Sequence, residues 1–333
     1  MLKEFYIIDK YFKPLAKKHK DAYLLKEDAA LFSIRNNYKA VITTDTLIEG
    51  IHFFKGDIAK SIANKVMHVN LSDIAAMGAI PKFYTIALTL SNEQIKDDLF
   101  FQEFSNELSE IQKKYNITLL GGDTCLGETL SISITMIGEI LSTLTPLLKS
   151  QAKDKDSIFI SNTIGDSHLG LMYLKNKNQE IFQNLDSKDI DYLKKSYYFK
   201  EAQISLGDFL LNHSRCATDI SDGLTLSLQQ ILTLSTLEAD IDLNKIPLSK
   251  VASKIISKNK NLIIDLITGG DDYQLLFTIP HNRISIFNNM INYLNLKVTE
   301  IGTLKKTIEN TSNANYYLDG KKITITKNSF SHF

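Results

Sequence analysis

The chain has few cysteines, no excess of either charge and no long apolar run. Its two cysteines, Cys125 and Cys216, lie far apart in 333 residues, which excludes a disulfide framework and a Cys-x-x-Cys metal site. Basic and acidic residues both number 38, so the positive excess that nucleic-acid binding needs is missing. No stretch approaches 18 apolar residues, and Glu4, Asp9 and Lys10 interrupt any signal-peptide pattern. We therefore expect a cytoplasmic protein that binds neither nucleic acid nor a membrane.

The common nucleotide-binding signatures are also missing. The sequence contains no G-x-x-x-x-G-K-[ST], no G-x-G-x-x-G and no H-R-D paired with D-F-G. As far as motifs can decide, P-loop and protein-kinase folds are therefore excluded.

The patterns that are present predict an α/β protein of two domains. At about 150 residues per domain the length suggests two, and 44% apolar residues allow each domain a core. Helical spacing alternates with β-branched or alternating runs in a βαβαββ-like order, which predicts a mixed sheet with helices on one face. The expected elements are helices over 4–18, 57–78 and 93–115 and strands at 40–44, 83–90, 117–122 and 129–140.

A polar stretch over 141–156, with a proline and several charges, separates this pattern from a second α/β sandwich domain. We place the domains at residues 1–145 and 146–333. The second is expected to begin with a strand at 157–161 and to close with a hairpin turning at Asp319-Gly320. Further strands are expected at 217–221, 239–243, 273–279 and 297–304.

Acidic residues gather beside glycines where predicted strands end. They are Asp45, Asp123, Asp219, Asp222, Asp271 and Asp272. Any one of them has an ordinary explanation as a helix cap or a turn residue. If the turns converge, however, the carboxylates repel one another unless cations neutralise them. Magnesium takes oxygen ligands and shares them with substrate phosphates, so the set predicts phosphoryl transfer.

Several motifs together resemble the thiamine-monophosphate kinases, within the superfamily of aminoimidazole ribonucleotide synthetase, selenophosphate synthetase and HypE. The resemblance spans the whole chain. It is carried by TTDTLIEGIHF at 43–53, VNLSDIAAMGAIP at 69–81, LLGGDT at 119–124, GEI at 138–140, ATDISDGL at 217–224, TGGDDYQLLFT at 268–278 and SFSHF at 329–333.

The resemblance implies a homodimer with an ATP-binding first domain, several Mg²⁺ ions and direct phosphoryl transfer from ATP to thiamine monophosphate. The residues matching the family's magnesium ligands are Asp28, Thr43, Thr44, Asp45, Asp73, Asp123, Asp219 and Asp222. Those matching its ATP contacts are Tyr115, Gly122, Asp123 and Ser221, with Lys149 where we expect a phosphate-contacting arginine. His52, Asp271 and the C-terminal Phe330 match contacts to the thiamine substrate.

Two departures from the family pattern leave alternatives open. Lys26 and Glu27 stand where the family has Gly-Asp, and Lys149 keeps a charge but lacks the bidentate fork of arginine. One alternative is a nucleotide-binding regulator without catalysis, and another is a different ATP-using synthetase of the superfamily. A selenide-using enzyme is disfavoured because no cysteine precedes Cys125. His52, beside two phenylalanines, also has an ordinary explanation as a hydrogen-bonded core histidine.

Overall fold

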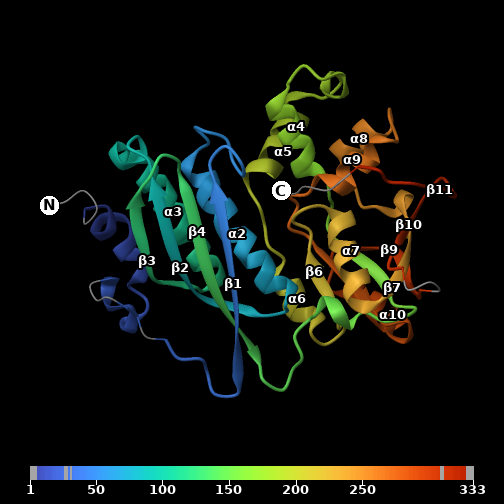
Figure 1. Cartoon of the computed structure of the whole chain (residues 1–333), viewed down its shortest axis with the longest axis horizontal. Coiled ribbons are helices and arrows are strands. Elements are labelled where there is room, and N and C mark those ends of the chain that lie inside the picture. Colours follow the sequence, from blue (N-terminus) through green and yellow to red (C-terminus); the bar gives the residue numbers. More distant parts are fainter. Residues whose placement is uncertain (1–5, 26–28, 31, 308–310, 328–333) are drawn as a thin grey trace. The chain divides into compact units, whose positions relative to one another are not determined.

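A computed structural model describes residues 6–25, 29–30, 32–307 and 311–327. Contacts within the chain divide it into two compact units (Figure 1). The first unit contains Met1–Ile74 and Ala79–Leu144, and the second contains Ala75–Gly78 and Thr145–Phe333. The last residues of one helix therefore belong to the second unit, although the helix itself starts in the first.

The first unit has the βαβαββ order that the sequence predicts. Its elements are β1 (Tyr38–Ile48), α2 (Ala59–Ala76), β2 (Ile80–Leu90), α3 (Asp98–Tyr115), β3 (Thr118–Leu126) and β4 (Ser131–Leu141). The strands form one sheet in the order β1-β4-β2-β3, in which only the β2–β3 pair is parallel. The sheet is therefore mixed.

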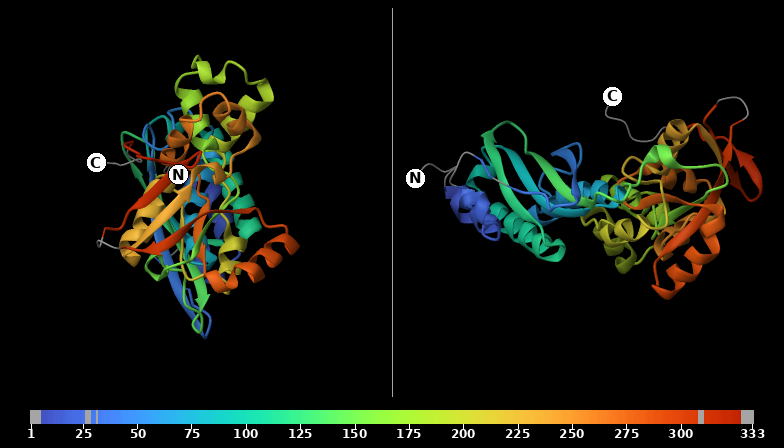
Figure 2. Two further views of the ribbon diagram at one scale, coloured as in Figure 1. Left: turned by 90° about the vertical axis from the view of Figure 1, so that its right-hand side faces the viewer. Right: turned by 90° about the horizontal axis from the view of Figure 1, so that it is seen from below.

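Helices α2 and α3 pack on the same face of this sheet (Figure 2, right). Asp73 of α2 contacts Thr43 on β1, and Gln112 of α3 donates to the hydroxyl of Tyr84 on β2 at 3.2 Å. Thr43 and Tyr84 pair with the same residue of β4, Met136, so both point to this face. The other face is exposed at several positions, among them Ile42 with 67% of its surface accessible.

The N-terminal segment is not the single α-helix expected over residues 4–18. A π-helical turn at Ile8–Phe12 is followed by short 3₁₀ helices at Lys13–Ala16 and Lys20–Leu25. Pro14 explains the break, because its nitrogen cannot donate the hydrogen bond that continues an α-helix. The apolar positions Phe12 and Leu15 are nevertheless buried. Similarly, a 3₁₀ turn at Gln94–Lys96 replaces the start of the helix expected from residue 93.

The second unit is built on a seven-stranded sheet in the order β11-β10-β7-β9-β5-β8-β6, with one parallel pair, β10–β7. Its strands are β5 (Ser157–Ser161), β6 (Ala217–Asp219), β7 (Leu237–Asp242), β8 (Leu275–Ile279), β9 (Val298–Lys306), β10 (Ala314–Leu318) and β11 (Lys321–Ile323). Its α-helices are α4 (Asp166–Lys175), α5 (Ser187–Tyr198), α6 (Ile204–Leu210), α7 (Leu224–Ser235), α8 (Lys250–Ile256), α9 (Leu262–Gly269) and α10 (Ile284–Tyr293). Short 3₁₀ helices lie at Lys149–Gln151, Glu180–Phe182, Leu243–Lys245 and His281–Arg283.

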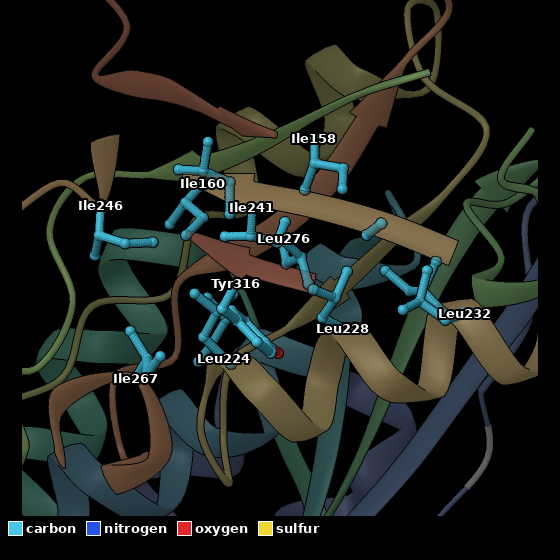
Figure 3. Close-up of a cluster of buried hydrophobic side chains, with 14 of the residues drawn as sticks. Ile158, Ile160, Leu224, Leu228, Leu232, Ile241, Ile246, Ile267, Leu276 and Tyr316 are labelled. Carbon is cyan, nitrogen blue, oxygen red and sulfur yellow. The ribbon is translucent and has the colours of Figure 1, made fainter. Parts of the chain in front are cut away.

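The core of the second unit lies between α7 and the sheet (Figure 3). Leu224, Leu228 and Leu232 line the buried side of α7 because they are spaced by four residues. They join Ile158 and Leu276 of neighbouring strands in one apolar cluster. The expected hairpin is confirmed: β10 and β11 pair antiparallel, and Asp319 and Gly320 both have positive φ, as a two-residue type I′ turn requires.

Among the described helices, none is long and apolar enough to cross a bilayer.

Candidate active site

In the first unit, β1 and α2 bring two of the expected magnesium ligands into contact. Thr43 donates to a carboxylate oxygen of Asp73 at 2.5 Å, which fixes that carboxylate against the strand. Asp45 lies two residues further along β1 and so points to the same face as Thr43. One turn before Asp73 on α2, Asn70 is fully buried, and its Oδ1 has no hydrogen-bond donor among the described residues. These are all oxygen groups of the kind that Mg²⁺ binds, and the orphaned amide oxygen fits such a ligand.

Strand alternation places Thr44 and Asp123 on the opposite face of the same sheet. The Thr44 hydroxyl shares a hydrogen bond of 2.8 Å with Thr135, away from Thr43 and Asp45. Asp123 pairs with Ala87 on the exposed side of β2 and is itself exposed. β1 and β3 are the two edges of the sheet, so three strand spacings, or about 14 Å, separate them. Within one chain, Asp123 and Asp45 therefore do not meet around a single ion.

His52 follows β1 in a tight turn and is held by the main chain. Its Nδ1 accepts from the backbone N–H of Ile48 at 3.0 Å, and its carbonyl oxygen accepts from Lys65 at 2.8 Å. Because Nδ1 is the acceptor, the proton of the neutral ring is on Nε2. The ring is only partly buried, which leaves part of its surface open to a ligand.

The residues of the first unit that are expected to contact ATP do not lie in one pocket: Gly122 and Asp123 lie at one place and Tyr115 at another. Gly122 and Asp123 line a cavity of about 170 Å³ between β3 and the N-terminal segment, together with apolar groups that include Phe12 and Leu88. Tyr115, at the end of α3, packs edge-on against the ring of His68, with 5.6 Å between ring centroids. Tyr115 is not among the residues that line this cavity.

In the second unit, two of the acidic turns run side by side. The backbone N–H of Asp271 donates to the carbonyl oxygen of Ser221 at 2.5 Å, and that of Tyr273 donates to Ile220 at 2.8 Å. These bonds join the segment 219–222, which begins at the last residue of β6, to the turn of residues 270–273, which precedes β8. Asp219, Ser221, Asp222 and Asp271 therefore belong to one local cluster.

A buried lysine that the sequence did not single out holds the Asp271 side chain. One carboxylate oxygen, Oδ2, accepts from the Ser167 hydroxyl at 2.7 Å and pairs with Lys200 Nζ at 2.9 Å. The Lys200 side chain is 2% exposed, whereas that of Asp271 is 20% exposed. Thus a carboxylate that a ligand can reach is oriented by groups that solvent cannot reach.

The neighbouring Asp272 has a structural role. Both of its carboxylate oxygens accept from the backbone N–H of Gly165, at 2.9 and 3.0 Å, just before α4. Burial raises the pKa of Asp272 well above its usual range, and Asp166 and Asp271 add to the rise, while Gly165 and Lys200 oppose it. This aspartate therefore links the turn to α4 from inside the unit.

Lys149 is directed to α7. Its Nζ donates to the side-chain oxygen of Gln230 at 2.6 Å, and its carbonyl oxygen accepts from Ser235 at 2.9 Å. A phosphate contact by Lys149 would compete with the Gln230 bond.

Some of the expected site residues are not described. Asp28 and Phe330, and the unusual Lys26 and Glu27, lie outside the described residues. Among those that are described, no three acidic, histidine or cysteine side chains are grouped as a metal site would need. The candidate ligands are divided: Thr43, Asp45 and Asp73 lie on one face of the first sheet, Thr44 and Asp123 lie on its two edge strands on the other face, and Asp219 and Asp222 lie in the second unit.

Ser167 and Lys200 are the site residues that sequence reasoning missed. Ser167 follows Gly165-Asp166 at the start of α4, after the loop that leaves β5, and this is the same glycine-aspartate signal that marks the other acidic turns. Lys200 carries no such signal, because it is one lysine among many and only the tertiary fold buries it.

Comparisons with known proteins identify the family to which the chain belongs. The family profile described as AIR synthase related protein, N-terminal domain, matches residues 26–140. The chain is 38% identical, over 99% of its length and 98% of the relative, to the thiamine-monophosphate kinase of Buchnera aphidicola subsp. Schizaphis graminum. It is 34% identical, over the same shares, to the thiamine-monophosphate kinase of Escherichia coli K12.

Solved structures show the same fold. The thiamine-monophosphate kinase of Stenotrophomonas maltophilia K279a superposes with a TM-score of 0.79 at 29% identity, covering 90% of each chain. A structure described as AaThiL complexed with AMPPCP and TMP superposes with a TM-score of 0.76 at 28% identity, covering 92% of this chain and 91% of that one. The hydrogenase maturation protein HypE with ATP, at 17% identity and a TM-score of 0.74, shares the fold alone.

Proposed function

This chain belongs to the thiamine-monophosphate kinase family, and we propose that it transfers the γ-phosphoryl group of ATP to the phosphate of thiamine monophosphate. The observation that carries the proposal is the joined pair of acidic turns, in which the Asp271 N–H bonds the Ser221 carbonyl. It brings a residue assigned to ATP next to one assigned to the thiamine substrate. Relatives over the full length that are named for this activity support it, as does the related structure with AMPPCP and TMP.

The reaction asks little acid-base chemistry of the protein. An oxygen of the acceptor phosphate, already ionised near neutral pH, attacks the γ-phosphorus, and the bond from that phosphorus to the β–γ bridging oxygen breaks. Thiamine diphosphate and ADP result, with no covalent enzyme intermediate. Catalysis then consists of holding two anionic groups in line. In this proposal His52 and Asp271 hold the acceptor, as does Phe330, while Tyr115, Gly122, Asp123, Lys149 and Ser221 hold ATP.

The carboxylates imply Mg²⁺ at this site. Thr43, Asp45 and Asp73, with Asp28, would hold metal on the first unit, and Asp219 and Asp222 on the second, with Thr44 and Asp123 completing the set. When bound, magnesium neutralises the charge between the two phosphates. The Thr43–Asp73 bond pre-orients one ligand before any ion arrives.

A homodimer explains why part of the set lies on the exposed face of the first sheet. That face carries small and hydroxyl side chains, with Thr44 bonded to Thr135 and Thr46 bonded to Ser133 at 2.7 Å. It also carries Ile42 and Asp123. We infer that a second copy covers it, so that the first domain, residues 1–145, serves both ATP binding and dimerisation, while residues 146–333 form the second α/β domain.

Turnover by the purified protein tests the proposal. With ATP, Mg²⁺ and thiamine monophosphate, we expect thiamine diphosphate and ADP in equal amounts. Titration calorimetry with ATP should show tight binding with Mg²⁺ and much weaker binding in EDTA, because the carboxylates repel an unscreened triphosphate. With γ-labelled ATP and no acceptor, the protein should stay unlabelled after a rapid quench.

Each part of this experiment can fail separately. ATP binding without turnover would favour the regulator, and equal ATP affinity in EDTA would remove the metal from the proposal. Label on the protein that chases into thiamine diphosphate would replace direct transfer by a two-step route.

A further inference from the structure

Lys200 is a buried cation whose hydrogen-bonding capacity is used inside the second unit. It follows α5, and its Nζ donates to the carbonyl oxygen of Ser196 at 2.9 Å and to the Ser167 hydroxyl. Its third partner is Asp271, at 2.9 Å. These three partners match in number the three N–H donors of an ammonium group.

The burial of the Lys200–Asp271 ion pair contributes little net stability to the fold. Removing an ammonium group from water has a large free-energy cost, and the attraction of a buried partner often does no more than offset that cost. A pair of this kind does, however, fix geometry. Here it fixes one particular carboxylate, since Ser167 and Lys200 converge on the same oxygen of Asp271.

The backbone of Asp271 is fixed as tightly as its side chain. The residue has φ +65°, in the left-handed region, and its N–H is bonded to Ser221. With the main chain and one carboxylate oxygen both held, the side chain has little rotational freedom left. A pre-oriented carboxylate binds its ligand without a further loss of conformational entropy.

We propose that Lys200, with Ser167, is a positioning residue for the acceptor: it holds the Asp271 carboxylate in the orientation that binds thiamine monophosphate. Lys200 itself does not touch the substrate, because its side chain is almost wholly inaccessible. The proposal rests on the proposed function. It adds that Lys200 and Ser167 affect the binding of thiamine monophosphate and not the binding of ATP.

Steady-state kinetics of two variants test this role. In Lys200→Met we expect the KM for thiamine monophosphate to rise roughly 10- to 100-fold, as for a misplaced binding group. In Ser167→Ala, which removes one neutral hydrogen bond, we expect a rise of roughly threefold to tenfold. The KM for ATP should stay within about twofold of wild type in both, because the change is confined to the acceptor contact.

Lys254→Met is the matched control. Lys254 also pairs with an aspartate of the second unit, Asp189, at 2.6 Å, but the pair lies on α8 and α5 and Lys254 is half exposed. We expect both KM values of this variant to equal those of wild type.

The outcomes separate the inference from the function on which it rests. If wild type gives no thiamine diphosphate, the proposed function fails. If wild type is active and the variants, still folded by circular dichroism, keep the wild-type KM for thiamine monophosphate, the positioning role is wrong. It is equally wrong if the KM values for both substrates rise together. Should Lys200→Met not fold, Ser167→Ala alone decides by the same criteria.

Discussion

At the scale of single residues, the joined acidic turns depend on Gly270. This glycine has φ +73°, and a Cβ atom there would lie 2.4 Å from the carbonyl oxygen of Ser221. The oxygen belongs to the backbone and accepts from Asp271, so it cannot move aside without breaking that bond. Gly270 is therefore required both for its conformation and for its lack of a side chain.

We predict that Gly270→Ala lowers the free energy of unfolding by roughly 3 kcal/mol, because alanine would be strained at φ +73° and ψ −164° and its Cβ would overlap the Ser221 carbonyl oxygen. Urea denaturation measures the change. Gly320→Ala is the matched control, because Gly320 has the same φ of +73° but a Cβ atom added there would meet open space. It should cost only about 1 kcal/mol. Equal losses in the two variants would show that the close approach at Ser221 does not exist.

The sequence could mark the residues of this cluster but not how they are held. Asp219, Asp222 and Asp271 stand out beside glycines, and the structure does place them on adjacent turns. Lys200 has no local signal, since its burial comes from packing between segments more than 70 residues apart. A sequence pattern reports local chemistry, whereas a charge pair of this kind is a product of the tertiary fold.

At the scale of elements, α4 carries a histidine that the fold keeps neutral. Burial lowers the pKa of His168 to about 4, helped by the charge of Lys327, and its Nδ1 has no hydrogen-bond partner among the described residues. The ring packs on Gly269, where a Cβ would approach it to 2.2 Å. In the unfolded chain the same group titrates near pH 6.5.

The depressed pKa has a definite consequence for stability. Between pH 6.5 and 4 the unfolded chain binds a proton that the folded chain does not, so stability falls as pH falls through this window. From pH 7 to pH 5 we expect His168 to contribute a loss of about 2 kcal/mol. His168→Gln should remove that part of the pH dependence in urea titrations, while the exposed His281→Gln should keep it. If the pH dependence of the free energy of unfolding were unchanged in His168→Gln, the His168 ring would not be neutral and buried in the folded chain.

The sequence predicts best those elements that are determined by residues close together in the chain. β-branched runs and alternation located every strand of the first sheet, and the Asp319-Gly320 turn fixed the hairpin. The prediction of an N-terminal α-helix was wrong because an apolar spacing of three to four residues also suits 3₁₀ and π turns. Pro14 prevents a continuous α-helix here. The ends of β1 and β3 extend beyond the predicted runs, since pairing with neighbouring strands continues through Asp45 and Asp123.

At the scale of the whole molecule, one face of the first sheet is not covered by α2 or α3 of the same unit and exposes the apolar side chain of Ile42. Hydroxyl side chains paired across strands, together with an exposed isoleucine, suit a surface that a flat partner can cover closely. The sequence could not reveal this, because alternation shows which residues share a face but not what covers it. Thr44 and Asp123 lie on that face, so in the proposed homodimer a second copy would cover part of the candidate site.

We therefore predict that Ile42→Lys weakens self-association and activity together. Ile42 is 67% exposed on this face, and a lysine buried against a second copy would lose its hydration without a partner. Sedimentation velocity should show a dimer for wild type and a dissociation constant raised at least about tenfold for the variant, equivalent to about 1.4 kcal/mol. Ile286→Lys is the control, because Ile286 is 62% exposed on α10 of the second unit. This variant should keep both the dimer and the wild-type turnover. A monomeric wild type that is fully active would mean that one chain completes the site alone, and then Thr44 and Asp123 would have no part in it.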